Sequence, residues 1–361
     1  MLRARRSCSA GPGHHSPKEV LCLDLLKYIL KRLAQAVFVL FGLSIVIFII
    51  SRIVPGDPAR MALGSRASDE AYAALRAEMH LEEPLASQYG YWIKGVFTGD
   101  LGNSITTKRA VAIDIREFLP ATLELVLMSA VFMVIFSILL GKVAARHRDK
   151  WPDALIRVLS YSGVAIPAFV MAILLLLLFG YKWEVIPVIG RLSSGFVAPT
   201  HITGLYVLDS LLAGDLATAL NAFLHLLVPA MALAAGGLFQ EARIIRTAMT
   251  DNLSKDYINA SKGYGVPNRL IMRKYLLKPS MIPAVSVMGL DIASLMANAF
   301  LVETIFTWPG ISRYGMTAML SKDLNAISAV IIIFGMIFVL VNIAVDLIVA
   351  WLDPRIRLGG D

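Results

Sequence analysis

Asp291, Ser294 and Asn298 are polar residues within a long apolar segment of the chain. A carboxylate at membrane depth costs free energy unless it is paired or hydrated, so such residues point to a function. Seven residues bring a helix back to within about 20° of its starting direction, which places the three side chains on one stripe. We interpret this stripe as part of a translocation path for a polar solute, and hydrogen bonding between helices is the alternative.

A second segment that could act on another molecule runs from Asp256 to Gly265. Ser254 is a predicted N-cap, Gly265 supplies a positive-φ stop, and Pro267 supplies the fixed φ of a helix start. The sequence therefore predicts a short helix, a sharp corner and a following helix. The basic residues of that following helix are Arg269, Arg273 and Lys274. Such a unit suits the groove of a partner, and a plain membrane-surface loop is the alternative.

The sequence lacks the common motifs of enzyme chemistry. It contains no GxxxxGK[ST] phosphate loop, no HExxH, no GxSxG and no CxxC. Its six histidines show no metal-ligand spacing apart from the adjacent His14 and His15, and its two cysteines are Cys8 and Cys22. We therefore expect a chain that is not an enzyme and that binds no metal and no cofactor. If the chain takes part in transport against a concentration gradient, the energy must then come from outside this chain.

Composition indicates whether these residues belong to a soluble protein or to a membrane protein. The 361 residues are 57% hydrophobic and 17% charged, and the mean hydropathy is +0.69. Soluble domains carry about a quarter charged residues, so these values argue against a soluble globule and against disorder. The net charge of +8 is typical of cytoplasmic loops in an apolar chain, so we expect membrane lipid rather than nucleic acid as the surroundings.

Six apolar segments are long enough to cross a membrane, since about 30 Å of hydrocarbon at 1.5 Å per residue requires about 20 residues. None alternates apolar with polar residues as a lipid-facing strand would. We therefore predict an all-α membrane protein with six transmembrane helices. The predicted spans are Leu33–Ser51 and, approximately, residues 120–141, 158–181, 222–242, 281–306 and 327–352.

Lys and Arg indicate the orientation of these spans. They gather before the first span, between the second and third, between the fourth and fifth, and after the sixth. Both termini are therefore expected in the cytoplasm. On the outer face, Arg313, Lys322 and Asp323 could receive a delivery protein, and an ordinary solvated loop is the alternative.

We divide the chain into three parts. Residues 1–25 are expected to be a disordered extension, and residues 26–118 to hold the first span and an outer-face subdomain. Residues 119–357 are expected to form a five-helix core with a cytoplasmic loop at about 254–278. Two amphipathic stretches predict helices in the subdomain, and residues 99–102 a turn that closes it. The first stretch holds Tyr72, Leu75 and Met79, and the second Leu85, Tyr89, Trp92, Ile93 and Val96.

Other polar residues near the span ends are interpreted as structural. Glu124 and Glu303 are expected to pair with neighbouring groups, and Asn342 with Asp346 forms an i,i+4 pair in the sixth span. Trp308 precedes Pro309 and Gly310, and it fits either an aromatic belt at the membrane surface or a helix-ending corner.

The short-helix segment resembles the cytoplasmic loop of ABC importer permeases, in which an E-A-A-x-x-x-G pattern docks on the ATPase. Here Asn259, Ala260 and Ser261 stand at the Glu-Ala-Ala positions, and a departure at this place is usual in the peptide and nickel branch. That branch is also similar at residues 28–33, 54–58, 119–125, 302–310 and 352–357. The segment's matching residues are Asp256, Tyr257, Ile258, Asn259, Ala260, Ser261 and Gly265.

The resemblance implies the first of two permeases of an oligopeptide or dipeptide importer in the bacterial plasma (inner) membrane. Its fold would be a type I permease with an outer-face insertion between spans one and two. The implied partners are a second homologous permease, two ATPase subunits that carry ATP and Mg, and an extracytoplasmic substrate-binding protein that delivers peptide. Nickel or nickel-chelate cargo is an alternative. A secondary transporter, which would be expected to show internal repeats and broken helices, is an alternative of another class.

Overall fold

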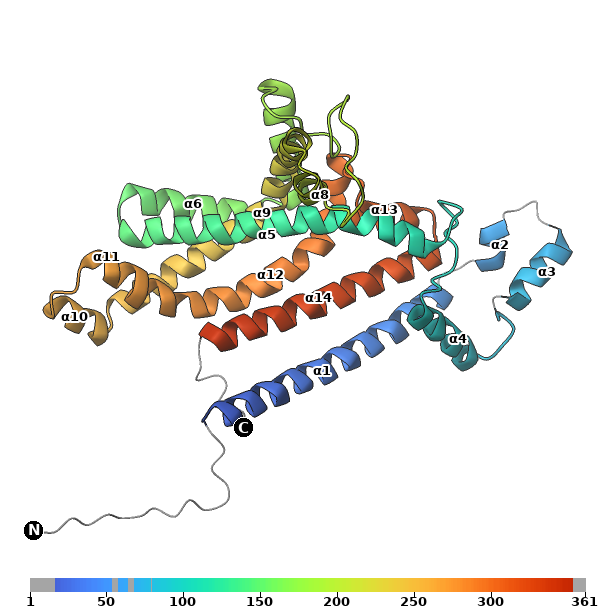
Figure 1. The fold of residues 1–361 in the computed structure, drawn as a ribbon, viewed down its shortest axis with the longest axis horizontal. Coiled ribbons are helices and arrows are strands. Elements are labelled where there is room, and N and C mark those ends of the chain that lie inside the picture. The colour runs from blue at the N-terminus through green and yellow to red at the C-terminus, as the bar shows by residue number, and fades with distance from the viewer. Residues whose placement is uncertain (1–16, 54–57, 64–67, 79, 353–361) are drawn as a thin grey trace, which may run out of the picture.

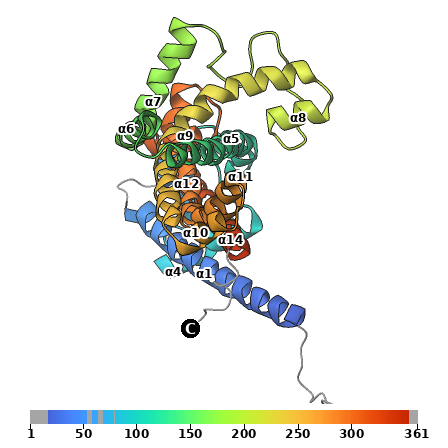
Figure 2. The same cartoon turned by 90° about the vertical axis from the view of Figure 1, so that its left-hand side faces the viewer.

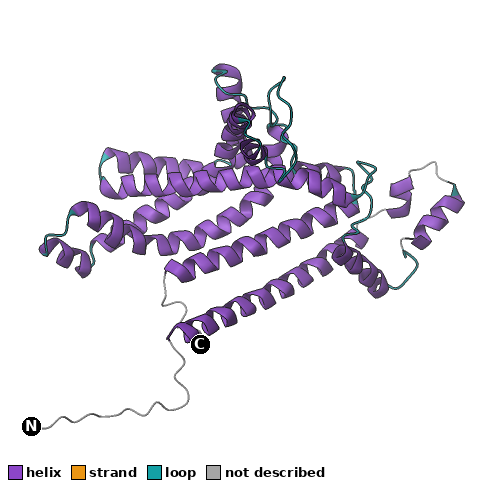
Figure 3. Cartoon of the chain, in the orientation of Figure 1, coloured by secondary structure: helices purple, strands orange, loops and turns teal. Residues whose placement is uncertain are grey.

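The computed structural model describes residues 17–53, 58–63, 68–78 and 80–352. These residues are mostly helical, and they contain no strand beyond an isolated bridge between Asn103 and Ala110 (Figure 3). The predicted motif at residues 54–57, Met79 and the C-terminal motif at 353–357 lie outside the described residues. The predicted extension is described only over residues 17–25, which are helical.

Five described helices are long and apolar enough to cross a membrane, in agreement with five of the six predicted spans. They pack side by side into an elongated bundle (Figure 1). These helices are α1 (Pro17–Ile53), α5 (Val111–Arg146), α9 (Leu216–Leu253), α12 (Lys278–Ile305) and α14 (Leu324–Leu352). The apolar segment of α12 starts ten residues earlier, at Asn268, because α11 (Asn268–Leu270) and the π-helical η2 (Ile271–Leu277) lead directly into it.

The predicted third span is not one straight helix. It is divided between α6 (Trp151–Ala165) and the segment formed by α7 (Ala168–Leu175) with η1 (Leu176–Lys182), and the two are bent by 109°. Ile166 has an extended backbone with φ −87° and ψ 116°, as expected before Pro167, whose ring disfavours a helical residue ahead of it. The bundle has six candidate spans if this bent pair counts as one.

Small residues allow the central helices to approach closely. A Cβ atom at Gly141 of α5 would lie 2.8 Å from the carbonyl oxygen of Ala242 on α9. On α9, Ala230, Ala232 and Ala234 are completely buried. Close packing of this kind is the main source of helix association in a membrane, where apolar burial gives little driving force.

The outer-face subdomain contains α2 (Pro58–Leu63), α3 (Asp69–Glu78) and α4 (Leu85–Thr98). It joins the bundle where α4 packs on α1, with the hydroxyl groups of Ser44 and Tyr89 2.7 Å apart. Gly99 ends α4 in the left-handed region with φ +81°, and Gly102 has φ +74°. The two predicted helices and the predicted turn are thus confirmed.

The remaining short helices lie at the two ends of the bundle. The helix α10 (Asp256–Gly263) and α11 lie near the connection from α5 to α6, as Figures 1 and 2 show, whereas α13 (Ile311–Leu320) lies at the other end with the outer-face subdomain. The helix α8 (Tyr206–Leu212) belongs to the long connection between η1 and α9. Asp346 of α14 pairs with Arg32 of α1 at 2.9 Å rather than with Asn342, whose side chain donates to the carbonyl of Phe338.

Candidate functional site

The short helix α10 begins at Asp256, as the sequence predicts, but Ser254 does not cap it. Ser254 ends α9, and its hydroxyl donates to the carbonyl oxygen of Asp251 at 2.9 Å. Lys255 holds the N-cap position with an extended backbone and no side-chain cap. The predicted N-cap is therefore wrong, because the serine hydroxyl is occupied by the preceding helix.

Gly265 forms the predicted corner after α10. Its φ of +73° lies in the left-handed region, which an L side chain rarely adopts. The N–H group of Val266 donates to the carbonyl oxygen of Ser261 at 3.1 Å and closes the last turn. Pro267 then occupies the N-cap position of α11 with φ −55°, so the corner between the two helices is only a few residues long.

Ile258 fixes α10 to the bundle. Its side chain is completely buried and packs in a cluster with Ile245 and Met249 of α9, Ile271 and Leu276. Most of the other predicted coupling residues are exposed, and Ser261 is half-buried. The exposed ones are Asp256, Tyr257, Asn259, Ala260 and Gly265. The helix is thus a rigid projection that presents its polar face outward.

The predicted stripe on α12 is only partly assembled. Asp291 is half-buried and accepts a hydrogen bond from Nε2 of Gln240 on α9 at 3.3 Å. Ser294 donates to the carbonyl oxygen of Asp291 at 2.8 Å within its own helix, and Asn298 is exposed. The structure brings Asp291 to α9, whereas the other two residues contact no polar group there among the described residues.

Glu241 is a further ionisable residue beside this stripe that the sequence interpretation missed. Its side chain is completely buried in α9, and both carboxylate oxygens lack a hydrogen bond of good geometry to any described residue. Its carboxyl group interacts electrostatically with that of Asp291. The rule that identifies Asp291 applies equally to Glu241, since both are acidic residues in predicted spans.

At the other end of the bundle, Glu303 joins three elements. Its Oε1 accepts from Oγ1 of Thr122 on α5 at 2.5 Å, and its Oε2 accepts from the backbone N–H of Arg313 in the first turn of α13 at 2.7 Å. Trp308 is 1% exposed, and its Nε1 donates to the carbonyl oxygen of Ala121 at 2.8 Å. The helix-ending corner is confirmed, and the aromatic-belt interpretation of Trp308 is wrong because the ring is buried.

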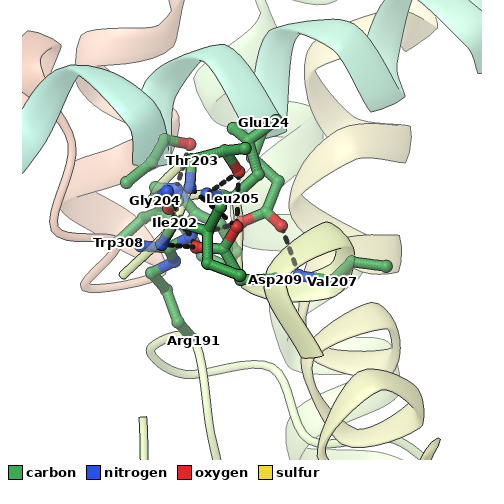
Figure 4. A network of polar contacts seen from close by, with 10 residues as sticks. Glu124, Arg191, Ile202, Thr203, Gly204, Leu205, Val207, Asp209 and Trp308 are labelled. Carbon is green, nitrogen blue, oxygen red and sulfur yellow. Dashed lines mark hydrogen bonds and ion pairs between the residues drawn. The ribbon is translucent and has the colours of Figure 1, made fainter. Parts of the chain in front are cut away.

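Glu124 forms the other predicted pairing with Arg191. Its Oε2 lies 2.5 Å from Nη2 of Arg191, and both side chains are 7% exposed. Its Oε1 accepts from the N–H of Val207 at 2.8 Å, and Arg191 also donates to the carbonyl oxygen of Gly204 at 2.9 Å. Figure 4 shows Glu124 reaching from α5 into this loop. The long connection is thereby fixed to the bundle.

Asp209 organises the same loop from α8 (Figure 4). Its carboxylate accepts from the N–H groups of Ile202, Thr203 and Gly204 and from the Thr203 hydroxyl at 2.6–3.2 Å. Burial alone would raise the pKa of Asp209, but these four hydrogen bonds outweigh it and hold that pKa below its ordinary value.

Asp323 also forms hydrogen bonds within the fold. It is completely buried and accepts from the hydroxyl of Ser104 at 2.6 Å and the N–H of Thr106 at 3.1 Å. It therefore does not present a free charge on the outer face. Over the described part of the chain, no three His, Cys, Asp or Glu side chains gather in a way that could hold a metal ion.

Several membrane-length helices, packed together with an anchored projecting helix, indicate a multi-pass membrane protein. The chain matches the family described as "Binding-protein-dependent transport system inner membrane component" over residues 133–358. Residues 25–126 match the N-terminal model of the same kind of membrane component. The chain belongs to this family, and it is a type I ABC importer permease of the inner membrane.

Similar proteins match this chain over nearly their whole length. A probable D,D-dipeptide transport system permease of Escherichia coli strain K12 is 39% identical over 90% of this chain and 95% of its own length. A dipeptide transport system permease of Alkalihalophilus pseudofirmus is 35% identical over 92% of this chain and all of its own. A glutathione transport system permease of Escherichia coli strain K12 is 31% identical over 92% of this chain and 99% of its own.

Proposed function

We propose that this chain forms half of the translocation path of an ATP-driven importer of short peptides. A second, homologous permease would supply the other half, and two ATPase subunits would carry ATP and Mg. A substrate-binding protein would deliver peptide from outside the cytoplasm. The names of the similar proteins, which refer to dipeptides and to glutathione, support a cargo of a few residues.

The observation that carries the proposal is the anchoring of α10. Ile258 is completely buried in the bundle, whereas Asp256, Tyr257 and Asn259 are exposed. A helix fixed in this way transmits a displacement of its outer face to α9 and α12 with little loss, because packed interiors deform little. This is the mechanical property that a contact with a moving ATPase requires.

Transport would follow alternating access. ATP binding on the partners would move α10 and its counterpart, and the two permease bundles would shift from the inward-open to the outward-open population. We propose that both termini and α10 face the cytoplasm, because Lys and Arg are concentrated in the connections on that side of the membrane. No ATP chemistry is assigned to this chain.

Asp291, Ser294 and Asn298 are proposed as path-lining residues, and Glu241 is added to them. The carboxyl groups of Glu241 and Asp291 interact across the contact between α9 and α12. Two carboxyl groups in a poorly hydrated region suit a cationic partner. The α-ammonium group of a peptide has this charge, so the pair would contact that end of the cargo during passage.

Reconstitution of the complete transporter in vesicles tests the coupling role of α10. Gly265→Pro removes the left-handed corner, and Asp256→Lys reverses the charge at the start of α10. Both should abolish ATP-driven uptake while the chain still inserts in the membrane. Lys278→Gln, an exposed charge change outside α10, is the matched control and should transport normally. Normal uptake by both α10 variants would contradict the coupling role.

A further inference from the structure

A basic groove lies beside α10, on the side toward α5. Its volume is about 980 Å³, and it is bordered by the end of α5, by α10 and α11, and by η2. Five of its eleven lining residues are Lys or Arg, and none is Asp or Glu. The five basic residues are Lys142, Arg146, Lys262, Arg269 and Arg273.

The groove has an apolar lining beneath its charged residues. Ala145 and Ile271 are buried, and Leu253, Val266 and Met272 are half-buried. A soluble anion would make no favourable contact with these apolar side chains, whereas an amphipathic ligand would contact both the basic and the apolar residues. The lining therefore distinguishes this groove from a patch of surface charge.

The basic residues of the groove have no acidic partner in the described part of the chain. No ion pair involves Lys142, Arg146, Lys262, Arg269 or Arg273 there, although nearby basic residues are paired. Arg246 on α9, for example, donates to both carboxylate oxygens of Asp153 at 2.8 Å. Five like charges around one groove repel each other, so an external anion would stabilise this arrangement.

We propose that the groove binds the headgroup of an anionic phospholipid. The groove adjoins the end of the predicted second span, residues 120–141, because Lys142 and Arg146 follow that span within five residues. At about 1.5 Å of helix rise per residue, these two side chains lie close to the level of lipid headgroups. Basic pockets between helices at this level recognise such headgroups. Arg and Lys supply charge-assisted hydrogen bonds to the phosphate, and the apolar lining receives the first part of the acyl chains. The inference does not rest on the proposed transport function.

Native mass spectrometry of the full-length chain in detergent tests this site. Phosphatidylglycerol should be retained in preference to phosphatidylcholine, which carries no net charge. The triple variant Lys142→Gln, Arg146→Gln and Arg269→Gln should reduce phosphatidylglycerol binding by about tenfold or more, since each basic residue near a headgroup contributes appreciably.

A second triple variant separates a site from general surface charge. Lys150→Gln, Lys255→Gln and Lys278→Gln remove the same charge from exposed residues that do not line the groove. This variant should bind phosphatidylglycerol within about twofold of the parent chain. Equal losses in the two triple variants would overturn the proposal, because they would show a nonspecific electrostatic attraction.

Two further measurements identify the occupant. Inorganic phosphate or ATP that displaces phosphatidylglycerol at millimolar concentration would overturn the lipid assignment in favour of a soluble phosphate. Unchanged lipid binding by the groove variant, with loss of ATPase subunits from the purified complex, would overturn it in favour of an acidic protein surface. Thermal unfolding of both triple variants at the parent temperature would show that each is folded, so that a loss of lipid reports on the groove.

Discussion

The hydroxyl group of Thr122 on α5 donates to the carboxylate of Glu303 on α12 over 2.5 Å, and both residues are completely buried. The same hydroxyl accepts from the N–H of Ile311 at 2.8 Å. The carboxylate therefore lies at the N-terminus of α13, where the helix dipole stabilises a negative charge. One pair of side chains thus joins three helices at this end of the bundle.

Gly310→Ala should destabilise this junction. A Cβ atom at Gly310 would overlap the carboxylate of Glu303, and overpacking of this kind costs about 1–3 kcal/mol. Thermal unfolding in detergent should show a clear decrease in midpoint. Gly263→Ala is the control, because a Cβ atom there meets no atom within 4 Å, and its midpoint should stay close to that of the parent. Equal midpoints for all three proteins would contradict the role of this contact.

Arg191→Met should destabilise the long connection by about 3 kcal/mol, because it leaves the buried carboxylate of Glu124 without its ion-pair partner. The double variant Glu124→Leu with Arg191→Met should recover part of this loss, since no uncompensated charge remains. Unfolding of the two single variants and the double variant gives the coupling energy. If the losses in unfolding free energy of the two single variants add up to the loss in the double variant, the 2.5 Å contact contributes nothing to stability.

The loop at residues 202–204 should loosen at acidic pH because of Asp209. The pKa of Asp209 is lower in the folded chain than its unfolded value of about 3.9. Its carboxylate therefore contributes stability above that unfolded pKa, and this stability is lost as the pH falls through the folded pKa. Limited proteolysis between about pH 6 and pH 3 should show increased cleavage in the loop near the acidic limit.

Asp209→Asn supplies the comparison for this pH dependence. The amide has one acceptor oxygen where the carboxylate has two, and its NH2 group would face N–H donors. The loop should therefore be cleaved more readily at neutral pH, and its cleavage should change little on acidification. An identical pH profile in the parent chain and the variant would assign the transition to another group.

Ile258→Ala should release α10 from the bundle. Truncation of a completely buried isoleucine costs about 2–5 kcal/mol, and here the loss falls on one short helix. Hydrogen exchange should accelerate over residues 256–266, with little change in α9. Tyr264→Ala, at a side chain that is 88% exposed, is the control and should leave exchange unchanged. Unaltered exchange in the isoleucine variant would show that other contacts hold the helix.

Much of the bundle could be predicted from apolar segment length, because a membrane requires a fixed number of helical residues. The third span shows the limit of this argument. Residues 158–181 remain apolar across Ile166 and Pro167, so hydropathy does not detect the bend of 109°. A proline at a similar depth, Pro229, lies inside the continuous helix α9, and neighbouring helices decide between the two outcomes.

The corner after α10 could be predicted from the sequence at Gly265, because it requires a left-handed backbone that glycine adopts freely. The anchor was not, since burial of Ile258 depends on side chains from α9 and η2 that are distant in sequence. The sequence predicts that Glu124 and Glu303 pair with neighbouring groups. It does not identify their partners, Arg191 and Thr122, because these depend on tertiary packing.

The ion pair between Arg32 and Asp346 joins the first long helix to the last one. The helix α1 packs on α14 and, at its other end, on α4, so it has few neighbours among the spans that follow it along the chain. The helix α1 precedes the other described spans along the chain, whereas its main packing partner, α14, follows all of them. Assembly of the described bundle therefore requires α14 to pack against α1 after the intervening spans are made, and truncation of the chain before α14 removes the main packing partner of α1.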